Sequence, residues 1–236
     1  MLFPDQLISR LANAPLVIIG EEHTRPEHHQ VETWLLQHLN RSRPQGSVLM
    51  EMIDSSQQAA VNRVKAESLS GTVVSASRAA EALRWNSGWP WPLYRDVVMT
   101  ALQARYPLLA ANISRQQTAA LYQHPVFPQG EHSSSPQVHK ALSAIIYLMH
   151  GGQIEGEQMT SMLAIQQQRD RFMATQLIGA PRPALLIAGG YHAAKDIGVP
   201  LHVADLGASA PVVVILTGEG TTLTPLQADY QWAMPQ

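Results

Sequence analysis

The sequence contains no cysteine among its 236 residues. This absence excludes disulfides, thiolate metal sites, cysteine nucleophiles and iron–sulfur clusters, and leaves histidine, aspartate, glutamate and tyrosine as candidate ligands. Charge is also sparse, because 14% of the residues are charged and the formal net charge is −2. Lysine is rare, with 3 lysines against 13 scattered arginines. Without a basic cluster, we expect no nucleic-acid partner.

Long apolar runs are missing as well. The longest ones, such as Pro211–Leu216, are far shorter than the stretch of about 20 residues that crosses a bilayer as a helix. The first residues, Met1–Asp5, show neither the charged segment nor the apolar stretch of a secretory signal. The motifs of serine hydrolases, Walker-type nucleotide-binding proteins and Rossmann dinucleotide-binding proteins are likewise absent.

What the sequence does contain is an alternation of short apolar runs and helical patterns. Apolar runs predict buried strands, at residues 16–19, 47–50, 107–111, 184–188 and 211–216. Apolar residues at helical spacing predict helices between them, at residues 26–40, 57–67, 79–85 and 93–106. This order predicts an α/β fold, with a largely parallel sheet covered by helices. With 45% hydrophobic residues, we expect a single domain over residues 1–236.

The segment between the strands at 107–111 and 184–188 is the longest connection. We expect it to form a helical insertion or lid subdomain over residues 113–183. Helical patterns occur there at 138–150 and 159–177, and both carry enough apolar positions to pack over the sheet or against a partner. We expect the strand at 211–216 to be the last, followed by a tail.

Polar side chains follow several of the predicted strands. In a parallel sheet the carboxyl ends of the strands meet at one edge, where ligands gather. The residues delivered there are Glu21, Glu22, His23, Glu51, Asn112, Tyr191 and His192. The first and fourth strands each run into a Gly-x-x-His turn, Gly20–His23 and Gly189–His192. Two such turns at equivalent strand ends predict a functional site at this edge.

Two chemistries fit these side chains. His23, His192, Glu21 and Glu51 offer the ligands of a divalent metal such as Mn, Zn or Co. In a metal-dependent hydrolase of the peptidase or esterase type, Glu21, Glu22 or Glu51 would then act as general base on metal-bound water. The other interpretation is structural: the glutamates cap the next helix and His23 bonds loop carbonyls. Adjacent His28 and His29 point about 100° apart on a helix, so we expect one of them to be solvated.

Tyr94 follows a tryptophan-rich loop that contains Trp89 and Trp91. A phenol oxygen at this position could ligate ferric iron, and the tryptophans could line an apolar slot. Alternatively, these rings form an aromatic cluster that only fills the core. Lys195, three residues after His192, could pair with a carboxylate of a ligand.

Taken in order, these motifs resemble the ChaN-type family of haem-binding uptake lipoproteins. The similar segments extend over nearly the whole chain: Ile19–His23 with His28, Leu49–Met52, Trp85–Tyr94, Ala110–Asn112, Gln167–Met173, Gly189–Pro200 and Ala228–Trp232. Gly-x-x-His turns are shared with a wider set of proteins that includes erythromycin esterase-like and Tiki-like enzymes. The ordered combination is more specific than any single turn.

The resemblance implies a haem-binding protein of bacterial haem and iron uptake, which holds haem at a homodimer interface and works with the uptake machinery rather than as an enzyme. It implies Tyr94 as the haem-iron ligand, with Tyr191 as second choice. His192 and Lys195 would contact the haem propionates, and His23 would be a further cofactor contact. It also implies a periplasmic location, with anchoring to the outer membrane by a lipidated N-terminus that this sequence does not contain.

Overall fold

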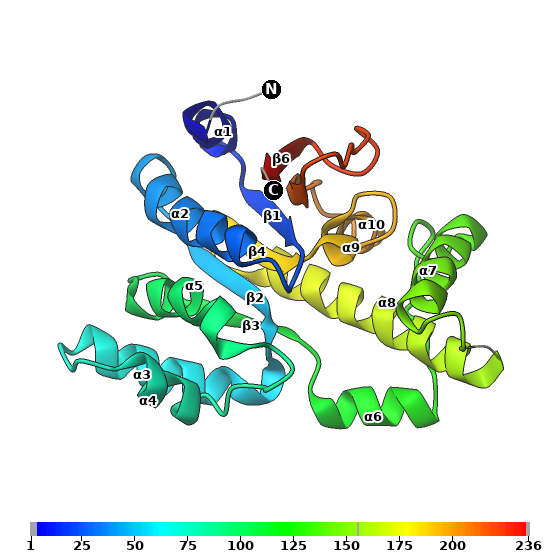
Figure 1. Ribbon diagram of the computed structural model, residues 1–236, viewed down its shortest axis with the longest axis horizontal. Helices are drawn as coiled ribbons and strands as arrows, with labels where there is room; N and C mark the ends of the chain where they lie inside the picture. Colours follow the sequence, from blue (N-terminus) through cyan, green and yellow to red (C-terminus); the bar gives the residue numbers. More distant parts are fainter. Residues whose placement is uncertain (1–3, 155, 235–236) are drawn as a thin grey trace.

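The computed structural model describes residues 4–154 and 156–234. Six strands form one sheet in the order β3-β2-β4-β1-β5-β6, and all neighbouring strands are parallel (Figure 1). The strands are β1 (Leu16–Glu21), β2 (Ser47–Asp54), β3 (Leu108–Asn112), β4 (Ala184–Gly189), β5 (Val212–Gly218) and β6 (Tyr230–Met234). The predicted α/β fold with a parallel sheet is confirmed.

Helices connect the strands. They are α1 (Pro4–Leu11), α2 (Pro26–Ser42), α3 (Gln58–Leu69), α4 (Ala76–Ala82), α5 (Trp91–Gln103), α6 (Arg115–Gln123), α7 (Pro136–Met149), α8 (Gly156–Gly179), α9 (Gly190–Ala193) and α10 (Val199–Asp205), with a short 3-10 turn η1 (Ser55–Gln57). The helical patterns of the sequence correspond to α2, α3, α4, α5, α7 and α8, whereas α1, α6, α9 and α10 were not predicted. Within the part of the chain that the structure describes, no helix is both long enough and apolar enough to cross a membrane.

The sheet has a hydrophobic core on each face. Strand side chains alternate between the faces, so Val17 and Ile19 of β1 enter one core and Leu16 and Ile18 the other. Helices α1 to α5 cover the first face, and α7, α8 and α10 cover the second. Because both faces are covered, all six residues of β1 and of β4 are buried, which explains their near-continuous apolar sequence.

After the two central strands, β1 and β4, the chain turns to opposite faces of the sheet. From β1 the chain passes into α2 on the first face, and from β4 it passes through α9 into α10 on the second. The strand order therefore has its switch point at the carboxyl ends of β1 and β4, the kind of place where open parallel sheets bind ligands. Both Gly-x-x-His turns lie there.

The segment predicted as an insertion contains α6, α7 and α8. The later part of α8 packs directly on the sheet through Met173, Ala174 and Leu177, while α6 and α7 lie farther out (Figure 1). One expectation at the end of the chain was wrong. The strand at 212–218 is not the last, because β6 pairs with β5 from Val214↔Tyr230 to Gly218↔Met234.

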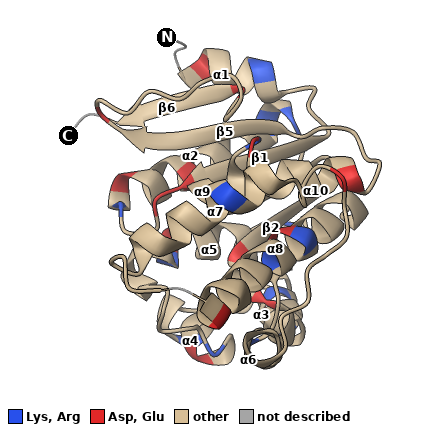
Figure 2. Cartoon of the chain, turned by 90° about the vertical axis from the view of Figure 1, so that its right-hand side faces the viewer, with Lys and Arg blue, Asp and Glu red and all other residues tan. Residues whose placement is uncertain are grey.

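Charged residues are interspersed on the molecule. In the view of Figure 2, lysine and arginine segments alternate with aspartate and glutamate segments, separated by long uncharged stretches. This distribution agrees with the low charged fraction of 14%.

Candidate functional site

The turn after β1 forms a hydrogen-bonded group of three side chains. Tyr94 of α5 donates its hydroxyl to Glu21 Oε1 at 2.9 Å, and His23 Nδ1 lies 2.5 Å from the same oxygen. Burial opposes protonation of His23, but the hydrogen bond to Glu21 and the charges of Glu51 and Glu21 together outweigh it and raise the pKa of His23. Tyr94 is completely buried, and burial together with the charge of Glu21 raises its pKa. The phenol therefore stays neutral and donates a hydrogen bond at the rim, which is the edge of the sheet formed by the carboxyl ends of the strands and the turns that follow them.

A second group surrounds His192 in the turn after β4. Its Nδ1 lies 2.5 Å from Asp170 Oδ1 of α8, and its Nε2 lies 3.3 Å from Glu51 Oε1. Burial opposes protonation, but the two carboxylates outweigh it and raise the pKa of His192 to about 10. Burial also opposes ionisation of Glu51, but the charges of His192 and His23 and the hydrogen bonds from His192 and Gly189 together outweigh it and lower the pKa of Glu51 to about 2. His192 is thus a buried cation held between two acids.

Gly189 separates the two groups. Its backbone N–H donates to Glu51 Oε2 at 2.7 Å. A Cβ added at Gly189 would lie 2.8 Å from His23 Nε2, closer than side chains approach one another. The ring of His23 therefore covers the backbone of Gly189, and a side chain at this position would have to push that ring aside. The two Gly-x-x-His turns do meet, as the sequence predicted.

The start of α2 adds residues to the first group. His28 and His29 are both buried, so the expectation that one of them is solvated was wrong. His28 Nδ1 accepts a hydrogen bond from the backbone N–H of Glu22 at 2.9 Å. His29 Nδ1 lies 3.1 Å from Glu32 Oε2, one turn along the helix. Burial raises the pKa of Glu32 to about 7.

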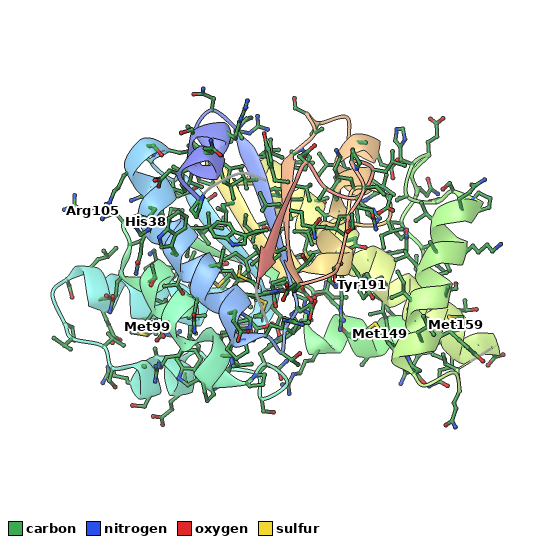
Figure 3. The ribbon with its side chains drawn as sticks, turned by 45° about the horizontal axis from the view of Figure 1, so that its top comes forward. His38, Met99, Arg105, Met149, Met159 and Tyr191 are labelled. Atoms are coloured by element: carbon green, nitrogen blue, oxygen red, sulfur yellow. The ribbon has the colours of Figure 1, made fainter. Side chains whose placement is uncertain are left out.

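Three other predicted residues lie outside these two groups. Glu22 is exposed and pairs with Arg25 at 2.8 Å. Lys195 pairs with Asp229 at 2.7 Å and is partly exposed. Tyr191 is 53% exposed and lies at the end of the sheet to which the strands point (Figure 3).

A cleft of about 460 Å³ opens beside Glu51, between α6 and α8. Its lining is mostly apolar and includes Met52, Trp89, Ile113, Ala119, Met162 and Ile165, together with the polar residues Asn112, Arg115, Tyr122 and Arg169. Of the two tryptophans expected to line a slot, Trp89 does so, whereas Trp91 packs on Trp85 at 5.0 Å between ring centroids. Tyr122 was not predicted as a site residue from the sequence, because the segment around it shows no recognisable periodicity or motif.

Asp170 and Glu32 were missed for a similar reason. Each lies inside a helix, where the sequence alone predicts that an acidic residue is exposed. Each is buried because its helix packs on the rim. The four residues predicted as a divalent-metal site do not assemble as one set. Among the described residues, the group whose ligand atoms all lie within 4.8 Å consists of Glu21, His29 and Glu32. The metal-dependent alternative thus finds no support in the predicted residues.

Comparisons with known proteins identify the family of this chain. Residues 7–203 match the protein family described as haem-binding uptake, Tiki superfamily, ChaN. Among solved structures, the chain is similar to ChaN of Campylobacter jejuni, described as showing cofacial heme binding. The TM-score is 0.89 and the identity 28%, covering 98% of this chain and 91% of the other. A comparison with curated proteins gives no match.

More distant structures share the fold alone. An erythromycin esterase, EreC, in its open conformation has a TM-score of 0.56 at 12% identity, covering 94% of this chain and 75% of the other. The type III effector HopBA1 has a TM-score of 0.50 at 15% identity, covering 92% and 82%. The family match spans most of the chain and agrees with the resemblance seen in its motifs. The chain therefore belongs to the ChaN family of haem-binding uptake proteins in the Tiki superfamily.

Proposed function

We propose that this protein binds haem in the cleft between α6 and α8, with Tyr122 as the ligand of the iron, and that a second copy of the chain covers the open side. The observation that carries this proposal is the composition of the cleft in a member of a haem-binding family. An accessible phenol stands there among apolar side chains, with two arginines beside it.

The cleft suits each part of a haem. The macrocycle is apolar, and Met52, Ile113 and Ile165 offer it apolar surface. Tyrosine is a haem-iron ligand type, and Tyr122 is 47% exposed. The propionates need cationic donors, and Arg169 lines the cleft with a buried Nε atom that makes no hydrogen bond.

Accessibility favours Tyr122 over the tyrosines chosen from the sequence. Tyr94 is completely buried and its hydroxyl is bound to Glu21, so iron would have to displace that carboxylate. Tyr191 is accessible but does not line the cleft. Both stay candidates to be tested beside Tyr122.

A second copy is supported by exposed apolar surface. Leu148 and Met149 at the end of α7 are 75% and 71% exposed, and Tyr147 beside them is 46% exposed. Contiguous exposed apolar residues are typical of interaction surfaces. From the second copy we expect Tyr191 and Lys195 to reach the propionates, because an exposed ion pair such as Lys195–Asp229 exchanges partners at little cost. His192 and His23 would stay bound to their carboxylate partners and support the carboxyl end of the sheet.

We infer further that the protein serves bacterial haem uptake in the periplasm, anchored to the outer membrane through a lipidated N-terminus. This part of the proposal rests on the family. It is tested by locating the full-length natural protein in fractionated cells and by analysing its N-terminus by mass spectrometry.

Hemin titration of the purified protein tests the binding site. We expect saturable binding and an absorption spectrum of ferric haem with a tyrosinate ligand. Tyr122→Phe should shift the Soret band and weaken hemin binding by about 10-fold or more. Tyr230→Phe is the control, because Tyr230 lies on β6, outside both the cleft and the exposed apolar surface at the end of α7. An unchanged Tyr122→Phe spectrum beside an altered Tyr191→Phe spectrum would move the iron ligand to Tyr191.

The role of the second copy is tested on the same samples. Light scattering coupled to gel filtration should show a dimer in the presence of hemin. Leu148→Glu, which places a charge in the exposed apolar surface, should leave the protein folded but monomeric. A protein that binds hemin tightly while remaining monomeric would contradict the shared site.

A further inference from the structure

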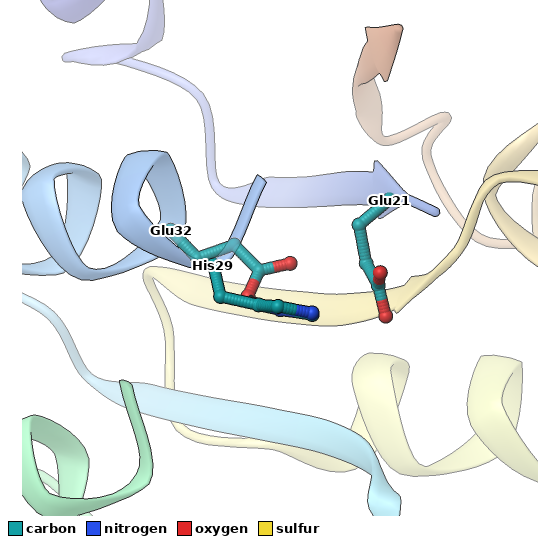
Figure 4. A group of neighbouring side chains, drawn as sticks. All are labelled: Glu21, His29 and Glu32. Atoms are coloured by element: carbon teal, nitrogen blue, oxygen red, sulfur yellow. Dashed lines mark hydrogen bonds and ion pairs between the residues drawn. The ribbon is translucent and has the colours of Figure 1, made fainter. Parts of the chain in front are cut away.

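Glu21, His29 and Glu32 form a buried group that the haem site does not use. Glu21 ends β1, and His29 and Glu32 lie three residues apart near the start of α2, on one face of the helix. Figure 4 shows the three side chains directed toward one another. They are 2%, 3% and 1% exposed, so the group is closed to bulk water.

The group contains two carboxylate oxygens that lack partners. Glu21 Oε2 and Glu32 Oε1 are both buried and make no hydrogen bond. A buried acceptor without a partner destabilises the fold, and native proteins satisfy nearly all such atoms. Two of them facing the same small space indicate that a positively polarised species belongs between them.

We propose that Glu21, His29 and Glu32 bind a divalent metal ion of the Mn, Co or Zn type. One imidazole and two carboxylates are ligands that these ions accept. One atom from each residue lies within 4.8 Å of the others, so small side-chain movements suffice to close the group around an ion.

The surroundings would hold these ligands in place. Glu21 Oε1 is already engaged by Tyr94 at 2.9 Å and by His23 at 2.5 Å, which leaves Oε2 for the ion. The ring of Tyr94 packs on His29 with a centroid distance of 4.3 Å and shields the group. Hydrogen-bonded and packed ligands of this kind are typical of metal centres. The ion would join the end of β1 to the start of α2.

The site is separate from the haem cleft, because none of its three residues lines that cleft. The buried position also leaves no room for a substrate, so we assign the ion a structural role. Failure of this proposal would leave the haem proposal standing, since hemin binding can be measured on protein freed of other metals.

Cobalt binding tests the proposal. The full chain is treated with chelator, desalted, incubated with CoCl2 and desalted again, and bound cobalt is measured by mass spectrometry and by its visible absorption. We expect about one cobalt per chain, a raised Tm on binding, and affinity at least about 10-fold lower in Glu32→Gln. Glu22→Gln, which changes the exposed neighbour of Glu21, should bind as the unchanged protein does.

Measurements on the unchanged protein guard against a misfolded variant. Co²⁺ is paramagnetic, so bound at this site it should shift the ring-proton resonances of His29 and leave those of His124 in place. Circular dichroism checks that Glu32→Gln keeps its fold. The proposal is overturned if no cobalt stays bound, if Glu32→Gln binds cobalt with unchanged affinity, or if the ring-proton resonances of His29 stay in place when cobalt binds.

Discussion

The imidazole of His192 lies 2.5 Å from the carboxylate of Asp170, and both side chains are buried. The pair joins α8 to the turn after β4, so the long helix of the segment between β3 and β4 is attached to the rim by charge as well as by apolar packing. The same imidazole reaches Glu51 of β2 at 3.3 Å. Three elements distant in sequence therefore depend on one side chain.

Removing one member of this pair should destabilise the fold strongly. Asp170→Asn leaves His192 with a single acidic partner in a buried setting, and breaking a buried pair in this way costs about 3–5 kcal/mol. Urea unfolding followed by circular dichroism measures the loss. Glu157→Gln, on the same helix but exposed, should unfold at nearly the urea concentration of the unchanged protein. Equal midpoints for the two variants would show that the pair contributes little.

The charge of His192 predicts a loss of stability in alkali. Its pKa is raised from 6.5 to about 10, so protonated His192 stabilises the fold fully below pH 6.5, and this contribution disappears as the pH rises toward 10. The free energy of unfolding, measured in urea from pH 6 to pH 10, should fall over this interval. His192→Gln should fall less, and the difference isolates the imidazole because the other groups titrate in both proteins. Parallel curves would contradict the assignment.

Glu51 predicts a loss on the acid side. Its pKa is lowered from 4.5 to about 2, so the ionised carboxylate stabilises the fold above pH 4.5 and ceases to do so as the pH falls toward 2. Asp170 acts in the opposite direction, because burial raises its pKa to about 6 and favours its protonated form. Acid unfolding of Glu51→Gln should therefore be less steep below pH 4.5 than that of the unchanged protein. A curve of the same steepness would assign the acid transition to other carboxylates.

The sequence was sufficient to predict the fold and those residues of the rim that directly follow a strand. Buried parallel strands are apolar throughout, and their ends are marked by Gly20 and Gly189, so the strand ends and the residues after them were predictable. Asp170 and Glu32 were not, because their burial depends on how α8 and α2 pack, and nothing in the neighbouring residues records that packing. β6 left a weaker signal in the alternation of Tyr230, Trp232 and Met234.

Tyr94 shows that residue type and motif position do not predict whether a side chain is accessible. Its position in a matching motif and its phenol oxygen made it the first choice for iron, but α5 directs it into the sheet toward Glu21. Tyr122, in a segment with no recognisable pattern, is the tyrosine that lines a cleft. Accessibility is a property of the packed molecule, and spacing along the chain does not encode it.

Gly20 should not tolerate a side chain. A Cβ at this position would lie 2.6 Å from Ala193 Cβ and 3.2 Å from Gly190 Cα, so Gly20→Ala must push the turn after β4 away from β1. Overpacking of this kind costs about 1–3 kcal/mol. Gly179→Ala is the control, because a Cβ there meets nothing within 4 Å. Thermal unfolding should show a lower Tm for the first variant only, and a Tm loss of equal size in both would contradict the close approach.

Tyr94→Phe separates a structural phenol from an iron ligand. The substitution removes the hydroxyl that donates to Glu21 Oε1 at 2.9 Å, and a buried acceptor that loses its donor costs about 1–3 kcal/mol. His23 still engages the same oxygen, so we expect a destabilised protein that keeps its fold. If haem binds through Tyr122, this variant should show the Soret band of the unchanged protein once hemin is in excess, although its Tm is lower. A shifted Soret band in Tyr94→Phe together with an unshifted one in Tyr122→Phe would mean that haem binding opens the rim, displaces Glu21 and takes Tyr94 as its ligand.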